Sequence, residues 1–153
     1  MIEIEKVGVV RNNRKDINDD FWGNVESFIE LEKHLPISSF AGIDKFSHVT
    51  VIFYMHKVLD ERVCTDSRHP RNNTSFDKVG IFAQRGKNRP NKIGVTTCEI
   101  VGVNQNILHV KGLDAINNTP VLDIKPLFKK FTINEKDIQE ARWVDDVMKN
   151  YYE

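Results

Sequence analysis

The stretch HVTVIFYMHK, residues His48–Lys57, is the most strand-like part of this sequence. It is rich in β-branched and aromatic residues, which pack well on a pleated surface. Apolar side chains fall on both of its faces, as they do in a strand covered on both sides. We therefore expect this segment to be the central strand of the fold.

Further segments on both sides of this strand also have strand-like patterns. In Ser27–Lys33, for example, Ile29 and Leu31 alternate with Glu30 and Glu32. The others are Glu3–Val10, Val79–Gln84, Ile93–Val103, Ile107–Leu113 and Val121–Ile124, with a hairpin turn expected at Asn104-Gln105-Asn106. No helical pattern separates these strands, which argues against a βαβ fold. The sequence predicts a mainly β, single-domain barrel with antiparallel or mixed strands.

Only the C-terminal part changes to a helical period. Asn134 can cap a helix, and apolar residues then recur every three to four positions. These are Ile138, Ala141, Val144, Met148 and Tyr151. We expect residues 1–132 to form the barrel, and residues 133–153 to form a helix that packs on the same domain or on a dimer partner.

The composition is that of an ordinary globular protein of 153 residues, with 40% hydrophobic and 29% charged residues. No apolar run is long enough to cross a membrane, and the charged N-terminus does not resemble a signal peptide. Cys64 and Cys98 lack the spacing of a zinc site or a disulfide framework. We expect a cytoplasmic protein that has no metal site and no membrane association.

The charges are unevenly distributed, although 22 basic residues balance 22 acidic ones. Between Arg62 and Lys92 the only acids are Asp66 and Asp77, among the cations Arg62, Arg68, Arg71, Lys78, Arg85, Lys87, Arg89 and Lys92. From Asp16 to Glu32 there are acids but no lysine or arginine. The basic segment could face the phosphates of a nucleic acid, or it could be a solvated loop.

Within this segment, the loop between Gln84 and Ile93 is longer and more basic than a hairpin requires. Gly86 and the pair Pro90-Asn91 are residues typical of turns. The surplus of cations suggests a loop that holds an anion or a base. Arg85, which leaves the preceding strand, is the best candidate for a bidentate donor to a carboxylate or phosphate.

A second polar stretch, GLDAINNTPVLDIKP, covers Gly112–Pro126. The turn Asn117-Asn118-Thr119-Pro120 presents amides and backbone groups that could bind a ligand. Asp123 and Lys125 share one face of the following strand, where they could form a surface ion pair or face a site.

Three motifs in this order resemble the tRNA methyltransferase O family, also called the TsaA-like domain. FAQRGKNRPNKIG is similar to that family's FATRSPxRPNPIG, GLDAINNTPVLDIKP to LDxxDGTPVLDIKPY, and FSHVTVIFYMH to FSHLWVIFxFH. A Pro-Arg pair at Pro70-Arg71 also matches. The resemblance implies a homodimeric β-barrel that binds S-adenosyl-L-methionine and N-methylates threonylcarbamoyl-adenosine beside the anticodon of tRNA.

Carried over by position, the resemblance implies a set of site residues. Contacts to S-adenosyl-L-methionine would come from Trp22, His56, Lys57, Arg85, Val95, Asn117, Asn118, Thr119 and Pro120. Contacts to the tRNA substrate would come from Arg71, Lys87, Arg89, Asn91 and Lys125. The family's Asp-Gly is replaced by Asn117-Asn118, which removes a carboxylate. Asparagine can still adopt the left-handed backbone that glycine supplies.

Methyl transfer to a conjugated nitrogen also needs a group that accepts the departing proton. The candidates are Asp114, Asp123 and His48, the last of which is expected to share a strand face with His56. Both histidines could instead be packing residues. Two other functions remain open: a barrel that binds S-adenosyl-L-methionine as a sensor, and a methyltransferase with a different acceptor. A doubly wound methyltransferase is disfavoured because no GxGxxG follows a strand.

Overall fold

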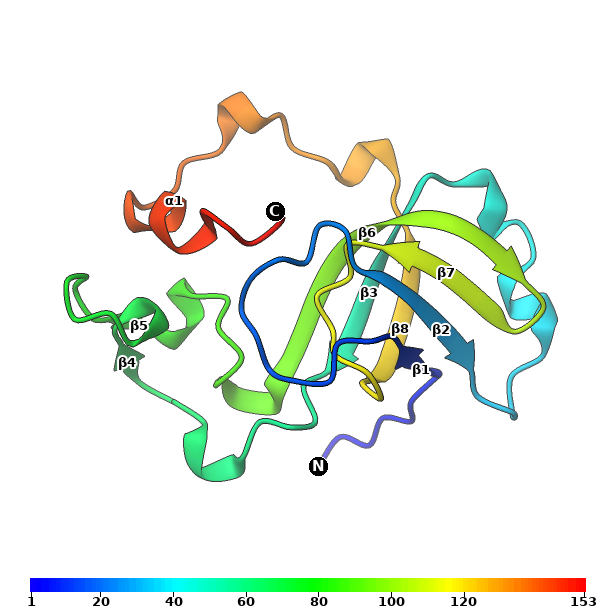
Figure 1. The fold of residues 1–153 in the computed structure, drawn as a ribbon, viewed down its shortest axis with the longest axis horizontal. Coiled ribbons are helices and arrows are strands. Elements are labelled where there is room, and N and C mark those ends of the chain that lie inside the picture. The colour runs from blue at the N-terminus through cyan, green and yellow to red at the C-terminus, as the bar shows by residue number, and fades with distance from the viewer.

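A computed structural model describes all residues, 1–153. Six antiparallel strands form a closed barrel in the order β1-β2-β7-β6-β3-β8, and Figure 1 shows them in the right half of the molecule. Their bounds are Gly8–Arg11 (β1), Glu26–Leu31 (β2), His48–Tyr54 (β3), Ile93–Asn104 (β6), Ile107–Lys111 (β7) and Pro120–Pro126 (β8). The expected β-barrel is therefore confirmed, and its strand pairs are all antiparallel.

The strand expected to be central, β3, pairs with β6 on one side and with β8 on the other. Its inward residues Val49, Val51 and Phe53 are buried, and the residues between them are partly exposed. Val51 lies opposite Thr96 of β6 and Ile124 of β8. A shift in register between Ile52 and Phe53 marks a bulge, a feature that bends a strand.

The barrel interior contains the main hydrophobic core. Its fully buried members come from most strands and from the segment after β7; they are Val10, Ile29, Val49, Val51, Leu108, Val110, Leu113 and Val121. The hairpin between β6 and β7 is confirmed, with Gln105 and Asn106 as its two loop residues. Gln105 has a positive φ of 54°, as the tight hairpin turns require.

Two elements differ from the expectation. Val79–Gln84 contributes only the two-residue strand β5, Val79–Gly80, which pairs with β4, Ser67–Arg68, outside the barrel. The chain then forms a single 3-10 turn, Ile81–Ala83, in which Ile81 is buried and Phe82 is exposed. With little sheet surface on which to pack, the apolar residues of this segment do not form a longer strand.

The C-terminal helix is also shorter than predicted. Asn134 does cap a turn, because its side chain accepts a hydrogen bond from the backbone N–H of Lys136, but that turn is the 3-10 turn Glu135–Asp137. The helix α1 covers only Trp143–Met148. All residues from 129 to 142 are exposed, so this arm has no packing surface that would stabilise a longer helix.

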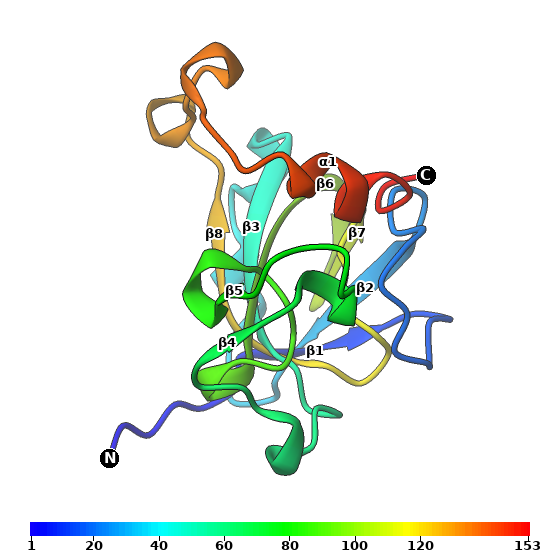
Figure 2. The same ribbon diagram turned by 90° about the vertical axis from the view of Figure 1, so that its left-hand side faces the viewer.

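The remaining short elements are single 3-10 turns, at Ile37–Phe40, Ile43–Lys45, Asp60–Arg62, Pro70–Asn72, Pro90–Lys92 and Lys129–Phe131. Figure 2 shows that the C-terminal arm rises away from the barrel after β8 and returns through α1. The protein has no helix with the length and apolar character of a membrane span.

Candidate active site in a cavity at the open end of the barrel

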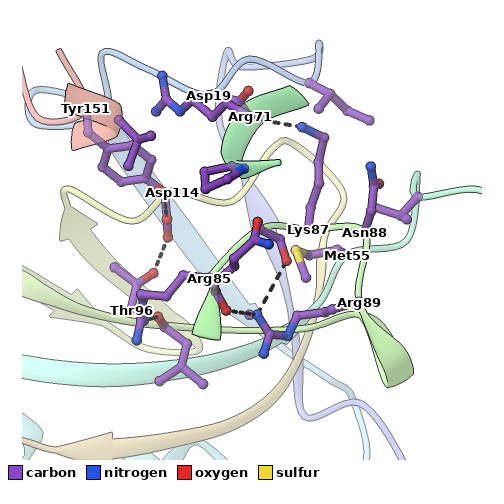
Figure 3. Close-up of a pocket in the computed structure, with 18 of the residues that line it drawn as sticks. Asp19, Met55, Arg71, Arg85, Lys87, Asn88, Arg89, Thr96, Asp114 and Tyr151 are labelled. Atoms are coloured by element: carbon purple, nitrogen blue, oxygen red, sulfur yellow. Dashed lines mark hydrogen bonds and ion pairs between the residues drawn. The ribbon is translucent and has the colours of Figure 1, made fainter. Parts of the chain in front are cut away.

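A cavity of about 720 Å³ lies between the barrel, the irregular segment of residues 68–89 and the C-terminal helix. Ligand pockets typically measure roughly 300–1,000 Å³ and combine apolar walls with a few polar groups. The cavity walls include Trp22, Met55, Trp143 and Val147. Figure 3 shows the polar side chains that project into this space.

The carboxylate of Asp114 lies at the centre of a hydrogen-bond network in the cavity. The Thr96 hydroxyl donates to one of its oxygens and the Tyr151 hydroxyl donates to the other. The site is built by local sequence: Gly112, with a φ of 86°, turns the chain after β7, so that Leu113 enters the core and Asp114 follows. An ionised carboxylate has about four acceptor positions, so Asp114 can accept further hydrogen bonds from a ligand.

The two groups bonded to this carboxylate differ in exposure and origin. Thr96 is buried within β6, whereas Tyr151 follows α1 near the C-terminus. Burial, and secondarily the charge of Asp114, strongly raise the pKa of the Tyr151 hydroxyl, so this phenol is a donor at neutral pH. The same two causes raise the pKa of the nearby buried thiol of Cys98 to about 12.

Arg85 provides the complementary positive charge. Its Nη2 donates to the backbone oxygen of Val95 over 3.1 Å, and no carboxylate pairs with it. Val95 directly precedes Thr96, so neighbouring residues of β6 hold Arg85 and Asp114. Both side chains line the cavity, so a ligand there can contact a cation and an anion.

The other residues of the basic loop hold its shape. Arg89 Nη1 donates to Gln84 O over 2.7 Å and weakly to Gly86 O (Figure 3). The buried Gln84 side chain in turn donates to the backbone oxygens of Arg68 and Val79. Arg89 lines the cavity, but these bonds occupy part of its guanidinium.

His56 and Lys57 line the cavity just after β3 ends at Tyr54. The Nδ1 atom of His56 is buried and has no hydrogen-bond partner. Burial, with a smaller effect of Lys57, lowers the pKa of the imidazole, so the ring is neutral at pH 7. Lys57 Nζ donates to Lys15 O over 2.9 Å.

Two ion pairs lie at the part of the cavity wall that contains Asp19, Arg71 and Lys87, which we call the cavity mouth. Asp20 accepts two bonds from Arg71, of 2.8 and 3.1 Å, and Asp19 pairs with Lys87 at 2.9 Å. The acidic and basic segments of the sequence thus meet in the structure, and the charge of the basic segment is partly neutralised. Trp22, buried beside this mouth, carries the Arg14 guanidinium 3.8 Å from its ring centre.

The turn Asn117–Pro120 lies mostly outside the cavity, and only Thr119 lines it. Asn118 has a φ of 69°, which confirms that asparagine can take the left-handed backbone here. The amides of this turn bond to the segment after β1: Asn117 Oδ1 accepts from Asn12 N, and Asn118 Oδ1 from Arg11. These bonds give the turn a structural role in the barrel wall.

Several other candidates do not line the cavity. Asp123 and Lys125 form a partly exposed ion pair of 2.7 Å on β8, and Asn91 is exposed in its own turn. His48 begins β3 at the opposite end from the cavity, and its ring bonds to Ser47. The expectation that His48 and His56 share a strand face was wrong, because β3 ends at Tyr54 and the chain turns there.

The structure also adds residues that the sequence analysis missed. Thr96, Tyr151 and Trp143 reach the cavity from a strand and from the C-terminal segment. Trp143 and Tyr151 are eight residues apart on a segment interpreted only as a packing helix. No group of three or more histidine, cysteine or acidic side chains is placed to hold a metal ion.

Comparison with known proteins decides the family. A model of the tRNA-methyltransferase O N-terminal domain matches residues 15–132, which is most of the chain. The chain belongs to this family. The matched residues contain every strand of the barrel except β1, and they include Arg85, Thr96 and Asp114.

The relatives of this chain have two kinds of description. A probable S-adenosyl-L-methionine-binding protein of Methanothermobacter thermautotrophicus is 33% identical over 131 residues, covering 84% of this chain and 91% of that protein. A similar Pyrococcus abyssi protein is 29% identical over 144 residues, covering 88% and 73%. The human tRNA (adenine(37)-N6)-methyltransferase is 36% identical over 96 residues, covering 63% of this chain but 21% of the human protein.

A solved structure shares the fold. TrmO from Pseudomonas aeruginosa superposes with a TM-score of 0.74 at 23% identity, covering 93% of this chain and 61% of the TrmO chain. The present chain therefore spans only part of the length of TrmO and of the human protein, but most of the length of the Methanothermobacter protein.

Proposed function

We propose that this protein is an S-adenosyl-L-methionine-dependent methyltransferase that N-methylates threonylcarbamoyl-adenosine beside the anticodon of tRNA. The observation that supports the proposal is that Arg85 and Asp114 line one cavity, where each bonds to a neighbouring residue of β6, Val95 and Thr96. Arginine binds carboxylates through its planar fork, and an ionised carboxylate binds ammonium groups. Together they match the zwitterionic amino-acid end of the methyl donor.

The rest of the cavity fits the other parts of this ligand. Its volume suits a nucleoside with an amino-acid side chain, and Trp143 would supply aromatic surface for an adenine ring. When bound, the donor supplies an electrophilic methyl group on a sulfonium sulfur. The protein's task is to hold the acceptor nitrogen about 3–3.5 Å from that carbon and to exclude water.

A proton must leave the acceptor nitrogen during or after transfer. Of the three candidates considered from sequence, only Asp114 lies in the cavity, and we assign it primarily to binding the donor. His56, neutral at pH 7 and in the same cavity, is the second group able to accept this proton. Replacing His56 with glutamine should then lower kcat more than it weakens donor binding.

The tRNA would approach across the basic segment. Arg71 and Lys87 line the cavity mouth, where phosphates would compete with Asp20 and Asp19 for them. Lysine and arginine contacts to phosphates release counterions, so affinity should fall steeply as salt rises. A tRNA affinity that does not change between low and physiological salt contradicts this role of the segment.

A non-catalytic protein that binds S-adenosyl-L-methionine is the second candidate. The ion pairs Arg71–Asp20 and Lys87–Asp19 favour it, because they reduce the positive charge available to tRNA. The two relatives described as probable S-adenosyl-L-methionine-binding proteins are similar to this chain over 84% and 88% of its length.

One experiment separates the candidates. Purified protein is incubated with labelled S-adenosyl-L-methionine and tRNA carrying threonylcarbamoyl-adenosine, and mass spectrometry identifies the methylated nucleoside. Methyl transfer to that nucleoside supports the proposal, and donor binding by calorimetry without transfer supports the sensor or another acceptor. Arg85→Ala should weaken donor binding, whereas Arg62→Ala, on the same basic segment but away from the cavity, is the matched control.

We further propose that the protein works in the cytoplasm as a homodimer. The exposed apolar residues of the C-terminal arm, Phe131, Ile133 and Ile138, would be covered in such an assembly. The free cysteines Cys64 and Cys98 suit a reducing compartment. Light scattering tests the dimer, and a strict monomer contradicts it.

A further inference from the structure

The C-terminal segment Trp143–Tyr152 is attached to the rest of the molecule in an unusual way. It forms one side of the cavity through Trp143, Val147, Tyr151 and Tyr152. The arm that connects it to β8 is exposed throughout residues 129–142, and no residue after Val121 belongs to the buried core cluster. The segment is therefore held by its end contacts and not by the barrel core.

Those end contacts are few and specific. The backbone N–H groups of Phe21 and Trp22 donate to Asn150 O and Tyr151 O, over 3.0 and 2.8 Å. The Tyr151 hydroxyl donates to Asp114 across the cavity. Gly23 lies so close that a Cβ atom there would be 1.9 Å from Tyr152 O.

We propose that Tyr151 is a positioning residue for the Asp114 carboxylate, and that the segment Trp143–Tyr152 opens and closes as a separate wall of the cavity. In the closed state, Tyr151 and Thr96 fix both carboxylate oxygens, so the remaining acceptor positions face a ligand in a defined direction. In the open state, the backbone bonds to Phe21 and Trp22 break, and the barrel stays folded because its core contains no part of the segment.

The proposal gives a ligand a route into the cavity that leaves the ion pairs Arg71–Asp20 and Lys87–Asp19 intact. It rests on the proposed function only for the identity of the ligand, S-adenosyl-L-methionine. Opening of the wall is a property of the free protein, and local opening with few buried contacts is expected to be much easier than global unfolding.

Native-state hydrogen exchange of the whole protein tests the opening directly. The amides of Phe21 and Trp22 should exchange at least tenfold faster than those of β3, through an opening that depends little on denaturant. Gly23→Ala should accelerate these two amides by a further tenfold or more and leave β3 unchanged. Gly80→Ala is the matched control, because a Cβ there meets open space. If the two amides exchange together with β3, or do not respond to Gly23→Ala, the separate wall is refuted.

Tyr151→Phe tests the positioning role. It should weaken donor binding severalfold while 5′-methylthioadenosine, which lacks the amino-acid end, binds as before. Tyr54→Phe is the control, because Tyr54 does not line the cavity. Equal losses for both ligands would mean that Tyr151 only supports the wall. If the wall opens as expected and no donor binds to the wild-type protein, the proposed function fails and the opening stands.

Discussion

Replacing Asp114 with asparagine removes one charge from the cavity and changes little else. The two side chains have nearly the same size, and the Thr96 and Tyr151 hydroxyls can both donate and accept hydrogen bonds. Both can therefore bond to an amide in place of the carboxylate. We expect Asp114→Asn to fold as the wild type does.

The effect on binding follows from the chemistry of the lost contact. A hydrogen bond to a charged group contributes roughly 1.5–3 kcal/mol, and a tenfold change in Kd corresponds to about 1.4 kcal/mol. If Asp114 binds the donor's ammonium group, the Kd for S-adenosyl-L-methionine should rise by roughly 10- to 150-fold. The Kd for 5′-methylthioadenosine should stay within about twofold, because this ligand has no ammonium group. A twofold change in Kd corresponds to less than roughly 0.5 kcal/mol.

Isothermal titration calorimetry with both ligands measures the two changes. Asp123→Asn is the matched control, since Asp123 is a carboxylate outside the cavity that pairs with Lys125 on β8. An unchanged affinity of Asp114→Asn for S-adenosyl-L-methionine would refute the assignment. An equal loss for both ligands would place Asp114 at the nucleoside end of the site and refute the zwitterion reasoning.

Three further predictions concern single side chains. Because burial raises the pKa of Cys98 to about 12, a thiol reagent at pH 8 should modify Cys64 alone in the native protein and both cysteines in denaturant; equal native rates would contradict this. Because burial lowers the pKa of His56, the unfolded state takes up more protons as pH falls below about 6.5, so the free energy of unfolding should decrease there. In urea titrations, the free energy of unfolding of His56→Gln should decrease less at low pH than that of the wild type. The control His34→Gln, at an exposed histidine, should show the same decrease as the wild type. Leu108→Ala, which empties a fully buried site in the barrel, should lower the free energy of unfolding by about 2–5 kcal/mol, and a loss below 1 kcal/mol in urea titrations would argue against this core.

The sequence predicted the barrel well because the barrel depends on local patterns. Apolar alternation in β2, the doubly apolar pattern of β3 and the turn residues between β6 and β7 are each readable over a few neighbouring positions. The same reasoning failed at Val79–Gln84, which has a strand-like composition but little sheet on which to pack. It failed again at Asn134, where a helical period continues through an arm whose residues are all exposed.

Only part of the candidate site could be predicted from the sequence. Arg85, Lys87 and Arg89 were selected because their loop is too basic for a turn, and all three line the cavity. Local patterns cannot show that the Arg89 guanidinium donates a hydrogen bond to a backbone oxygen of its own loop, because that bond depends on the folded shape of the loop. Nor can they show that Asp19 and Asp20 reach the basic segment more than fifty residues away.

The sequence by itself determined the strand pattern, the family and the basic loop, because each depends on neighbouring residues or on a recognisable motif. The tertiary structure alone decided which carboxylate serves the cavity. Asp114 and Asp123 looked equivalent in the sequence, but the turn at Gly112 directs Asp114 towards Thr96 and Tyr151, while the pleat of β8 leaves Asp123 with Lys125 on the outer surface. Long-range contacts such as Tyr151 with Asp114 form only when the chain closes on itself, and no local pattern encodes them.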